Sequence, residues 1–231
     1  MAYESYFVNE TIKERTISDA WRMLILYASE KGIESVTKRG SYEGQIRRQL
    51  RFVRIHIEQP WIRPLAVSVP ENSPIPAPTS EERIHQYFHD YLLSPMKEDS
   101  KEDYTYGDYI IKQIHPVIDM LNESEGATNQ ATITIGEPAC IYLADPPCLR
   151  TICFNVLATE PKELQMLVHF RSWDIFAGFP ENMGGLQLLK EYVLANLNFE
   201  IIDGATEAIS NGAHIYEQYF PIVESLAPKV K

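Results

Sequence analysis

The stretch Cys148–Phe176 reads CLRTICFNVLATEPKELQMLVHFRSWDIF and decides the fold, because it predicts two strands joined by a short turn. Residues 148–158 and 164–176 are rich in β-branched and aromatic side chains, which favour strands. Between them, residues 159–163 form a cluster of turn-forming and charged residues around Pro161. So short a connection favours an antiparallel hairpin.

The register of this hairpin places a thiol beside three polar side chains. When the chain folds back about Pro161, Cys148 lies within a residue or two of Arg171, Ser172 and Asp174. A guanidinium near a thiol favours the thiolate, which is the reactive form. Two plainer interpretations stay open at this point: Cys148 as a small buried apolar residue, and Arg171 as a structural ion-pair partner of Asp174.

The rest of the chain alternates predicted helices and strands. Apolar spacing predicts helices over residues 18–32, 81–96, 107–121 and 178–198, with Ser18 as an N-cap and a bend or restart at Pro116. Strands are expected within residues 47–69, 131–144 and 210–220. The proline-dense segment Pro70–Ser80 is expected to be a loop. We therefore expect one domain, residues 1–231, that contains both helices and strands.

Composition and charge restrict the class of protein. A formal net charge of −11 argues against nucleic-acid binding, which needs many cations facing phosphates. The three cysteines are an odd count without metal-ligand spacing, so we expect free thiols and no metal. The N-terminus lacks the features of a signal peptide, and no run is apolar enough to span a membrane. We expect a cytoplasmic protein that binds neither nucleic acid nor membrane.

Two further groups of polar residues follow the hairpin. Asn182 stands near the start of the predicted helix, where an N-cap would be enough to explain it. His214 and Tyr216 are two residues apart on a predicted strand, so their side chains should lie on the same side of it.

Three segments resemble one known family. PPCLRTICF (residues 146–154), FRSWDIFAGFPENMGGLQLL (170–189) and GAHIY (212–216) are similar, in order and spacing, to motifs of thymidylate synthase. The resemblance is carried by the C-terminal third to half of the chain, and the chain's length resembles that of compact archaeal-type members. It implies the fold class α/β (α+β), in which a mixed β-sheet is flanked by helices and one face of the sheet forms a homodimer interface.

The resemblance also implies a reaction. The Cys148 thiolate would add to C6 of dUMP, which turns C5 into a carbon nucleophile. C5 would then take a methylene group from a reduced pterin, either methylene-tetrahydrofolate or methylene-tetrahydromethanopterin, to give dTMP. No metal takes part in this chemistry.

The same resemblance implies roles for individual residues. Besides Cys148, the catalytic residues would be Arg171 and Tyr106, with Tyr106 near a water that removes the C5 proton. The pterin would be held by Asp174 and Gly178. The nucleotide would be bound by six residues: Arg39, Arg171 and Ser172 on the phosphate, Asn182 on the base edge, and His214 and Tyr216 on the deoxyribose hydroxyl.

The chain also departs from the family pattern. The arginine pair that the partner subunit usually gives to the phosphate is replaced by Asn129 and Gln130. The basic cluster on residues 47–54 either substitutes for that pair or is a solvated strand face; it comprises Arg47, Arg48, Arg51 and Arg54. The family's N-terminal glutamate would be Glu81 or Glu82. We also expect the chain to lack the C-terminal segment that closes over the pterin in longer relatives.

Two alternatives to the methylation of dUMP stay open. One is a hydroxymethylase of pyrimidine nucleotides (dUMP or CMP type), in which water rather than hydride traps the methylene intermediate. The other is a nucleotide-binding relative that has lost turnover, which the missing arginine pair would favour.

Overall fold

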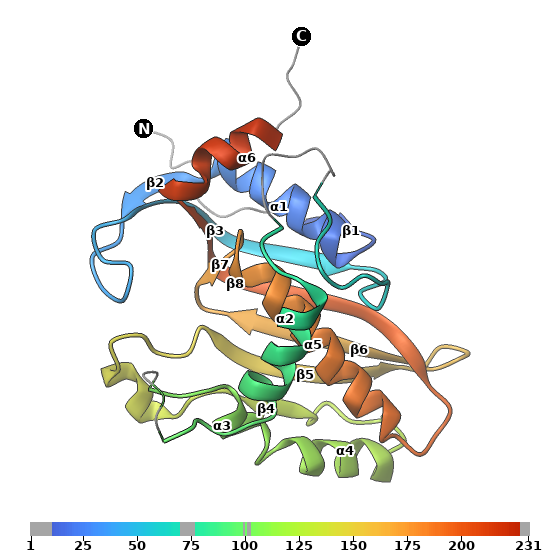
Figure 1. The fold of residues 1–231 in the computed structure, drawn as a ribbon. Coiled ribbons are helices and arrows are strands. Elements are labelled where there is room, and N and C mark those ends of the chain that lie inside the picture. Colours follow the sequence, from blue (N-terminus) through green and yellow to red (C-terminus); the bar gives the residue numbers. More distant parts are fainter. Residues whose placement is uncertain (1–10, 70–76, 99, 101–102, 227–231) are drawn as a thin grey trace, which may run out of the picture.

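The computed structural model describes residues 11–69, 77–98, 100 and 103–226 (Figure 1). Most of the predicted connector Pro70–Ser80 therefore lies outside the described residues. Its last residue, Ser80, caps the helix that follows by accepting a hydrogen bond from the backbone N–H of Arg83.

One mixed sheet forms the centre of the molecule. Its strands follow the order β1-β3-β8-β6-β5-β4, while β2 pairs with β3 and β7 pairs with β8. The pairs β1/β3, β6/β8 and β7/β8 are parallel, and the others are antiparallel. The bounds of the strands are β1 Thr11–Glu14, β2 Ile33–Val36, β3 Ile46–Ile57, β4 Thr132–Thr134, β5 Leu149–Leu157, β6 Glu163–Phe170, β7 Trp173–Asp174 and β8 Ile202–Tyr216. The predicted mixed sheet is confirmed.

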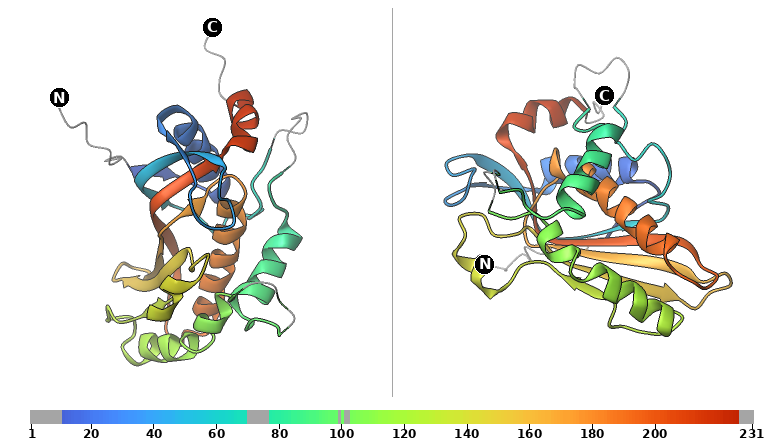
Figure 2. Two further views of the ribbon diagram at one scale, coloured as in Figure 1. Left: turned by 90° about the vertical axis from the view of Figure 1, so that its left-hand side faces the viewer. Right: turned by 60° about the horizontal axis from the view of Figure 1, so that its bottom comes forward.

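The helices lie on one face of this sheet (Figure 2). Their bounds are α1 Ile17–Lys31, α2 Glu81–Tyr87, α3 Gly107–Ile110, α4 Ile114–Glu123, α5 Gly178–Ala195 and α6 Phe220–Leu226. Along β6, every second side chain is buried beneath them, while the alternate ones remain half-buried. No described helix covers the opposite face, which we call the open face.

The hairpin predicted around Pro161 is confirmed. β5 and β6 pair antiparallel, from Leu157 opposite Glu163 to Leu149 opposite Phe170. The second strand is shorter than predicted, because the chain leaves β6 after Phe170 and pairs again, as β7, with β8. This break places Arg171 and Ser172 between two strands, at the end of the sheet where Cys148 enters β5.

The helix boundaries differ from the prediction at three places. Thr16, not Ser18, caps α1 and accepts from the backbone N–H of Asp19. The helix predicted over residues 81–96 is α2 followed by one π-helical turn, Phe88–Leu92. The helix predicted over 107–121 is two helices, and the break falls before Pro116, which lies in the first turn of α4. A first-turn residue needs no N–H partner, so proline is compatible with the helix there.

Candidate active site

Two adjoining cavities open where β5, β6, β8 and the loop between β2 and β3 meet. The thiol cavity, of about 290 Å³, is lined by Cys148, Asp174, His214 and Tyr216 among others. The basic cavity, of about 450 Å³, is lined by residues that include Lys38. Seven residues line both cavities: Thr37, Arg39, Arg47, Asp145, Pro146, Arg171 and Ser172. One continuous surface thus runs from the thiol to a group of cations.

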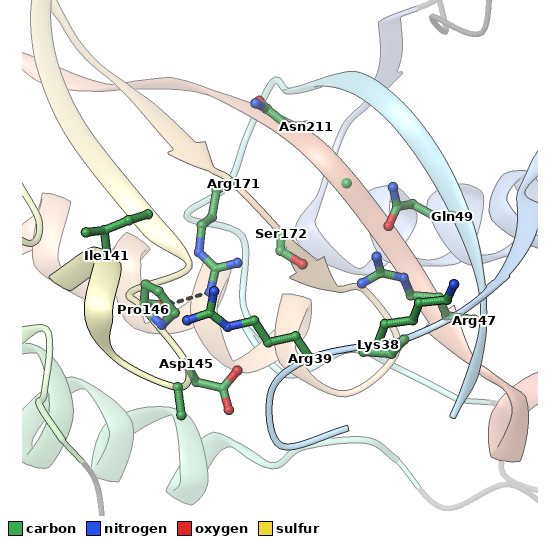
Figure 3. Close-up of a pocket in the computed structure, with 13 residues that line it drawn as sticks. Lys38, Arg39, Arg47, Gln49, Ile141, Asp145, Pro146, Arg171, Ser172 and Asn211 are labelled. Carbon is green, nitrogen blue, oxygen red and sulfur yellow. Dashed lines mark hydrogen bonds between the residues drawn. The ribbon is translucent and has the colours of Figure 1, made fainter. Parts of the chain in front are cut away.

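The pair Pro146–Pro147 explains how Arg171 is held beside Cys148. The backbone N–H of Arg171 donates to the carbonyl of Cys148 at 2.8 Å, as the hairpin register predicts. The guanidinium Nε donates to the carbonyl of Pro147 at 3.1 Å, and Nη2 donates to that of Pro146 (dashed line in Figure 3). The prolines bring carbonyl acceptors but no competing N–H donors.

The Cys148 thiol is half-buried and faces its cavity. Arg171 lowers its pKa, as the sequence suggested, but burial acts more strongly in the opposite direction. The net pKa of Cys148 is therefore raised, and the expectation of a thiolate in the unliganded protein is wrong. Cys148 lies on the cavity surface, however, so the alternative of a fully buried apolar residue is also wrong.

His214 presents an unused acceptor to the thiol cavity. It is 3% exposed, and its Nδ1 lies 2.9 Å from the carbonyl oxygen of Gly212, which can only accept. Burial lowers the pKa of His214 to about 4, so the ring is neutral at pH 7. Nε2 is then an acceptor, and it is buried without a partner among the described residues. Tyr216 lies on the same side of β8, with its ring centroid 4.8 Å from that of His214.

Asp174 lies at the end of β7, where it closes the turn into α5. Its Oδ1 accepts from the backbone N–H groups of Phe176 at 3.0 Å and Ala177 at 3.3 Å. Burial outweighs these hydrogen bonds and raises the pKa of Asp174 to about 6. Among the described residues, Asp174 and Arg171 form no ion pair, so the plainer interpretation of Arg171 is wrong.

Replacing Asp174 with asparagine should change the pH dependence of stability. The native pKa of about 6 exceeds the unfolded value of about 3.9, so this group's contribution to the free energy of unfolding falls as pH rises from about 4 to about 6. Asp174→Asn keeps the acceptor oxygen and has no such loss. Urea unfolding should show the variant gaining on the parent across this range and not above about pH 7. An equal gain for the exposed-site control Asp119→Asn, or a flat difference, would contradict the assignment.

Tyr106 reaches the backbone beside the nucleophile rather than the cavity itself. Its side chain is 6% exposed, and its hydroxyl accepts from the N–H of Leu149 at 3.2 Å. Burial raises the pKa of Tyr106 far above its ordinary value, so this hydroxyl stays protonated and is free to donate. Tyr106 is not part of the described lining of the thiol cavity, whereas Tyr104, two residues earlier in the chain, is.

Asn182 is not an N-cap, because α5 begins at Gly178 and Asn182 lies in its second turn. Its Oδ1 accepts from the indole N–H of Trp173 at 2.9 Å, and its Nδ2 donates to the hydroxyl of Tyr87 at 3.0 Å. These contacts fix which way the amide faces and leave one N–H and one lone pair. Neither cavity includes Asn182 in its described lining.

Gly178 lies between Asp174 and Asn182. A Cβ at this position would lie 3.5 Å from Asn182 Oδ1 and 3.7 Å from the Cβ of Asp174, which are ordinary contact distances. The protein's own packing therefore does not require a glycine here. The space over Gly178 and Asp174 is compatible with close approach of a ligand, as the resemblance implies for a pterin.

The basic cluster on β3 divides between two roles. Arg48 pairs with Glu34 and Glu224, and Arg54 pairs with Glu207. Arg47 instead lines both cavities, together with Arg39 (Figure 3). The alternative of a solvated strand face is therefore wrong for Arg47.

Residues of the β2–β3 loop also line the site without having been predicted: Thr37, Lys38, Ser41 and Tyr42. Tyr42 stacks on Tyr216 with ring centroids 4.4 Å apart, and the backbone N–H of Ser41 donates to Asp145 at 2.8 Å. A signal was present in the sequence, since this loop carries two adjacent cations before Gly40.

Glu81 and Glu82, the two positions predicted for the family's N-terminal glutamate, are not in the described lining of either cavity. Glu81 accepts a hydrogen bond from the backbone N–H of Ala66, and Glu82 is exposed. Asn129, one of the two residues that replace the arginine pair, lines a separate cavity at the start of β4. It therefore lies away from the thiol cavity and the basic cavity of its own chain.

The described ranges contain no set of three His, Cys, Asp or Glu side chains arranged to hold a metal ion. Within the same ranges, no helix is long and apolar enough to cross a membrane.

Residues 89–229 match the family model described as thymidylate synthase. A protein of Methanosarcina acetivorans named "Putative thymidylate synthase" is 26% identical to this chain over 229 residues, and the alignment covers 96% of this chain and 97% of that one. The namesake from Methanococcoides burtonii is 27% identical, covering 97% of each chain.

A solved structure has the same fold. Thermostable thymidylate synthase A from Bacillus subtilis superposes with a TM-score of 0.64 at 14% identity, covering 91% of this chain and 83% of that one. The predicted fold class is thereby confirmed.

Proposed function

The chain belongs to the thymidylate synthase family, and from that premise we propose that it methylates dUMP at C5 to give dTMP. The observation that carries the proposal is the continuous surface from the Cys148 thiol to Arg39, Arg47 and Arg171. A nucleoside monophosphate needs such a surface, because the sugar separates its electrophilic ring carbon from its phosphate.

The sugar would lie against His214 and Tyr216, between the two ends. Nε2 of His214 is an acceptor without a hydrogen-bond partner among the described residues, and the 3′-hydroxyl of a deoxyribose would donate to it. Ser172, Arg171 and Arg39 would bind the phosphate. The pyrimidine would then lie over Cys148.

In the first chemical step, the sulfur of Cys148 forms a bond to C6 of the pyrimidine. The electron pair of the C5–C6 double bond moves toward C5 and O4, and the thiol proton leaves to solvent or to a neighbouring base. The remaining N–H of Asn182 would donate to O4, and its remaining lone pair would accept from N3–H. Trp173 and Tyr87 support this role because they hold the amide in one orientation.

A methylene-carrying reduced pterin, of the folate or methanopterin type, would supply the one-carbon unit and the hydride. Asp174 and Gly178 would hold it, because a carboxylate and an open backbone lie side by side there. Tyr106 would orient a water that accepts the C5 proton; its raised pKa makes it unsuited to be the base itself. C5 would bond to the methylene carbon, lose its proton to that water and expel the pterin nitrogen, which would leave an exocyclic methylene group on the ring. Hydride from the tetrahydropterin would reduce this methylene to a methyl group as the Cys148 sulfur leaves C6 as a thiolate, so that the products would be dTMP and the dihydropterin.

The open face of the sheet would meet a second copy of the chain. Half-buried residues alternate with buried ones along most of β5 and along β6, and no described helix covers the half-buried ones. A homodimer would bury this face on both chains. Size-exclusion chromatography with light scattering should give the mass of two chains; a monomer at micromolar concentration would contradict this part.

Release of tritium from [5-³H]dUMP tests the proposed reaction, with each pterin supplied in turn. We expect release with at least one pterin, together with a product of the mass of dTMP. A product of the mass of 5-hydroxymethyl-dUMP would support the hydroxymethylase alternative. Tight binding of dUMP without release with either pterin would support a non-catalytic relative.

Asn182 should determine which base is accepted. The parent should use dUMP and not dCMP, whereas Asn182→Asp should shift the ratio of kcat/KM toward dCMP by about tenfold or more, because a carboxyl group can accept from the cytosine amino group. Asn182→Ala should lose both substrates without a shift. If Asn182→Asp keeps the parent's ratio, Asn182 does not face the base.

A further inference from the structure

We propose that Arg47 completes the phosphate site from within the same chain and replaces the arginine pair that relatives take from the partner subunit. The inference deepens the proposed function and rests on it. Each subunit would then hold its nucleotide with its own cations, even if two subunits associate.

The sheet brings Arg47 to the site. Arg47 lies opposite Tyr216 in the antiparallel pairing of β3 with β8, and Gln49 lies opposite His214. Arg47 is therefore next to the pair that would hold the sugar. It lines both the thiol cavity and the basic cavity, beside Ser172 and Arg171.

Arg47 has no hydrogen-bond or ion-pair partner within the part of the chain that the structure describes. Its Nε is buried and has no hydrogen-bond partner among the described residues. Its neighbours on the strand are paired: Arg48 reaches Glu224 at 2.8 Å, and Arg54 reaches Glu207 at 3.0 Å. A buried donor without an acceptor costs stability, so an anion that supplied one would be bound preferentially.

A second unpaired group lies beside it. Thr37 is 9% exposed, its Oγ1 has no partner within the described ranges, and it lines both cavities. Thr37 and Arg47 line the same two cavities, and a hydroxyl beside a guanidinium suits the oxygens of one phosphate.

The other cations of the site are partly used. Arg39 donates to the carbonyl of Leu143, and Arg171 donates to the carbonyls of Pro146 and Pro147. The one carboxylate in the described lining of the basic cavity, that of Asp145, accepts from Ser41. Arg47 and Lys38 have no ion pair with a described carboxylate, and they enter the basic cavity from the same side (Figure 3). These two side chains can supply the charge that Asn129 and Gln130 lack.

The first test compares the binding of dUMP and of deoxyuridine by calorimetry. Arg47→Gln should weaken dUMP about ten- to a hundredfold and leave deoxyuridine unchanged, because only dUMP carries the phosphate. Arg47→Lys should recover part of the loss, since lysine keeps the charge but not the fork. The control Arg22→Gln, an exposed cation on α1, should bind both like the parent. If Arg47→Gln binds dUMP within about twofold of the parent, the inference is wrong.

The second test distinguishes a site within one chain from a shared one. Arg47→Gln and Cys148→Ala subunits are unfolded together, refolded and assayed for tritium release from [5-³H]dUMP. Because we place both residues in one chain's site, no mixed dimer contains a complete site, and the mixture should release no more tritium than the separate variants. Recovery of activity in the mixture would show that Arg47 acts on the partner's nucleotide. A parent that neither binds dUMP nor releases tritium would refute the proposed function instead.

Discussion

Cys148→Ala should lower tritium release from [5-³H]dUMP by about a thousandfold or more, while dUMP still binds within a few-fold of the parent. Without the sulfur, C6 has no nucleophile in the thiol cavity, so C5 never gains the electron pair that it needs to attack the one-carbon unit. The phosphate and sugar contacts do not involve the thiol, so affinity should survive. Calorimetry for dUMP and the release assay measure the two effects separately.

Cys153→Ala is the matched control for this variant. Cys153 lies on β5, pairs with Thr132 and Leu167 across the sheet, and remains partly exposed on the open face. It should release tritium like the parent. Normal turnover by Cys148→Ala would remove the nucleophile from the account, and a matching loss in Cys153→Ala would point to general damage to β5.

Arg171→Leu should have the second-largest effect, because Arg171 acts on both ends of the site. It is the strongest of the groups that lower the pKa of Cys148, and it is one of the cations assigned to the phosphate. Its loss should raise the thiol pKa further and weaken dUMP binding, so kcat/KM should fall by about a hundredfold or more. The rate of iodoacetamide alkylation at Cys148, followed by peptide mass against pH, should shift to higher pH.

Arg150→Leu provides a graded comparison. Arg150 also lowers the pKa of Cys148, but it is the weakest of the influences on that thiol and stands outside the described lining of the cavities that receive the nucleotide. Its alkylation profile should move in the same direction by less, and dUMP should bind normally. An unchanged alkylation profile in Arg171→Leu would mean that burial alone determines the reactivity of the thiol.

Local patterns in the sequence were enough to assemble the centre of the site. Two strands with a short turn between them can pair in few registers, and this pairing predicts that Cys148 lies beside Arg171. The spacing of His214 and Tyr216 placed them on one side of a strand for the same reason. The mixed sheet was predicted from the family resemblance instead, because an alternation of strands and helices does not determine which strand pairs are parallel.

Other properties depend on contacts that no local pattern contains. The pKa of Cys148 is a balance between burial and Arg171, and only the packed cavity shows that burial prevails. Arg47 and Arg48 are adjacent in sequence, yet one faces the cavity and the other pairs with Glu224, because β3 lies between β2 and β8. The fixed amide of Asn182 depends on Tyr87, which is far away along the chain.

The central claim is that the sulfur of Cys148 bonds to the pyrimidine, and the mass of a trapped adduct tests it most directly. In 5-fluoro-dUMP, fluorine replaces the C5 hydrogen, so there is no C5 proton to remove. The reaction should therefore stop with the nucleotide still bonded to the sulfur. After incubation with this nucleotide and the pterin, denaturation and digestion, we predict that the added mass lies on the peptide containing Cys148. A nucleotide that is lost completely on denaturation, or an adduct on Cys140 or Cys153, would contradict the account.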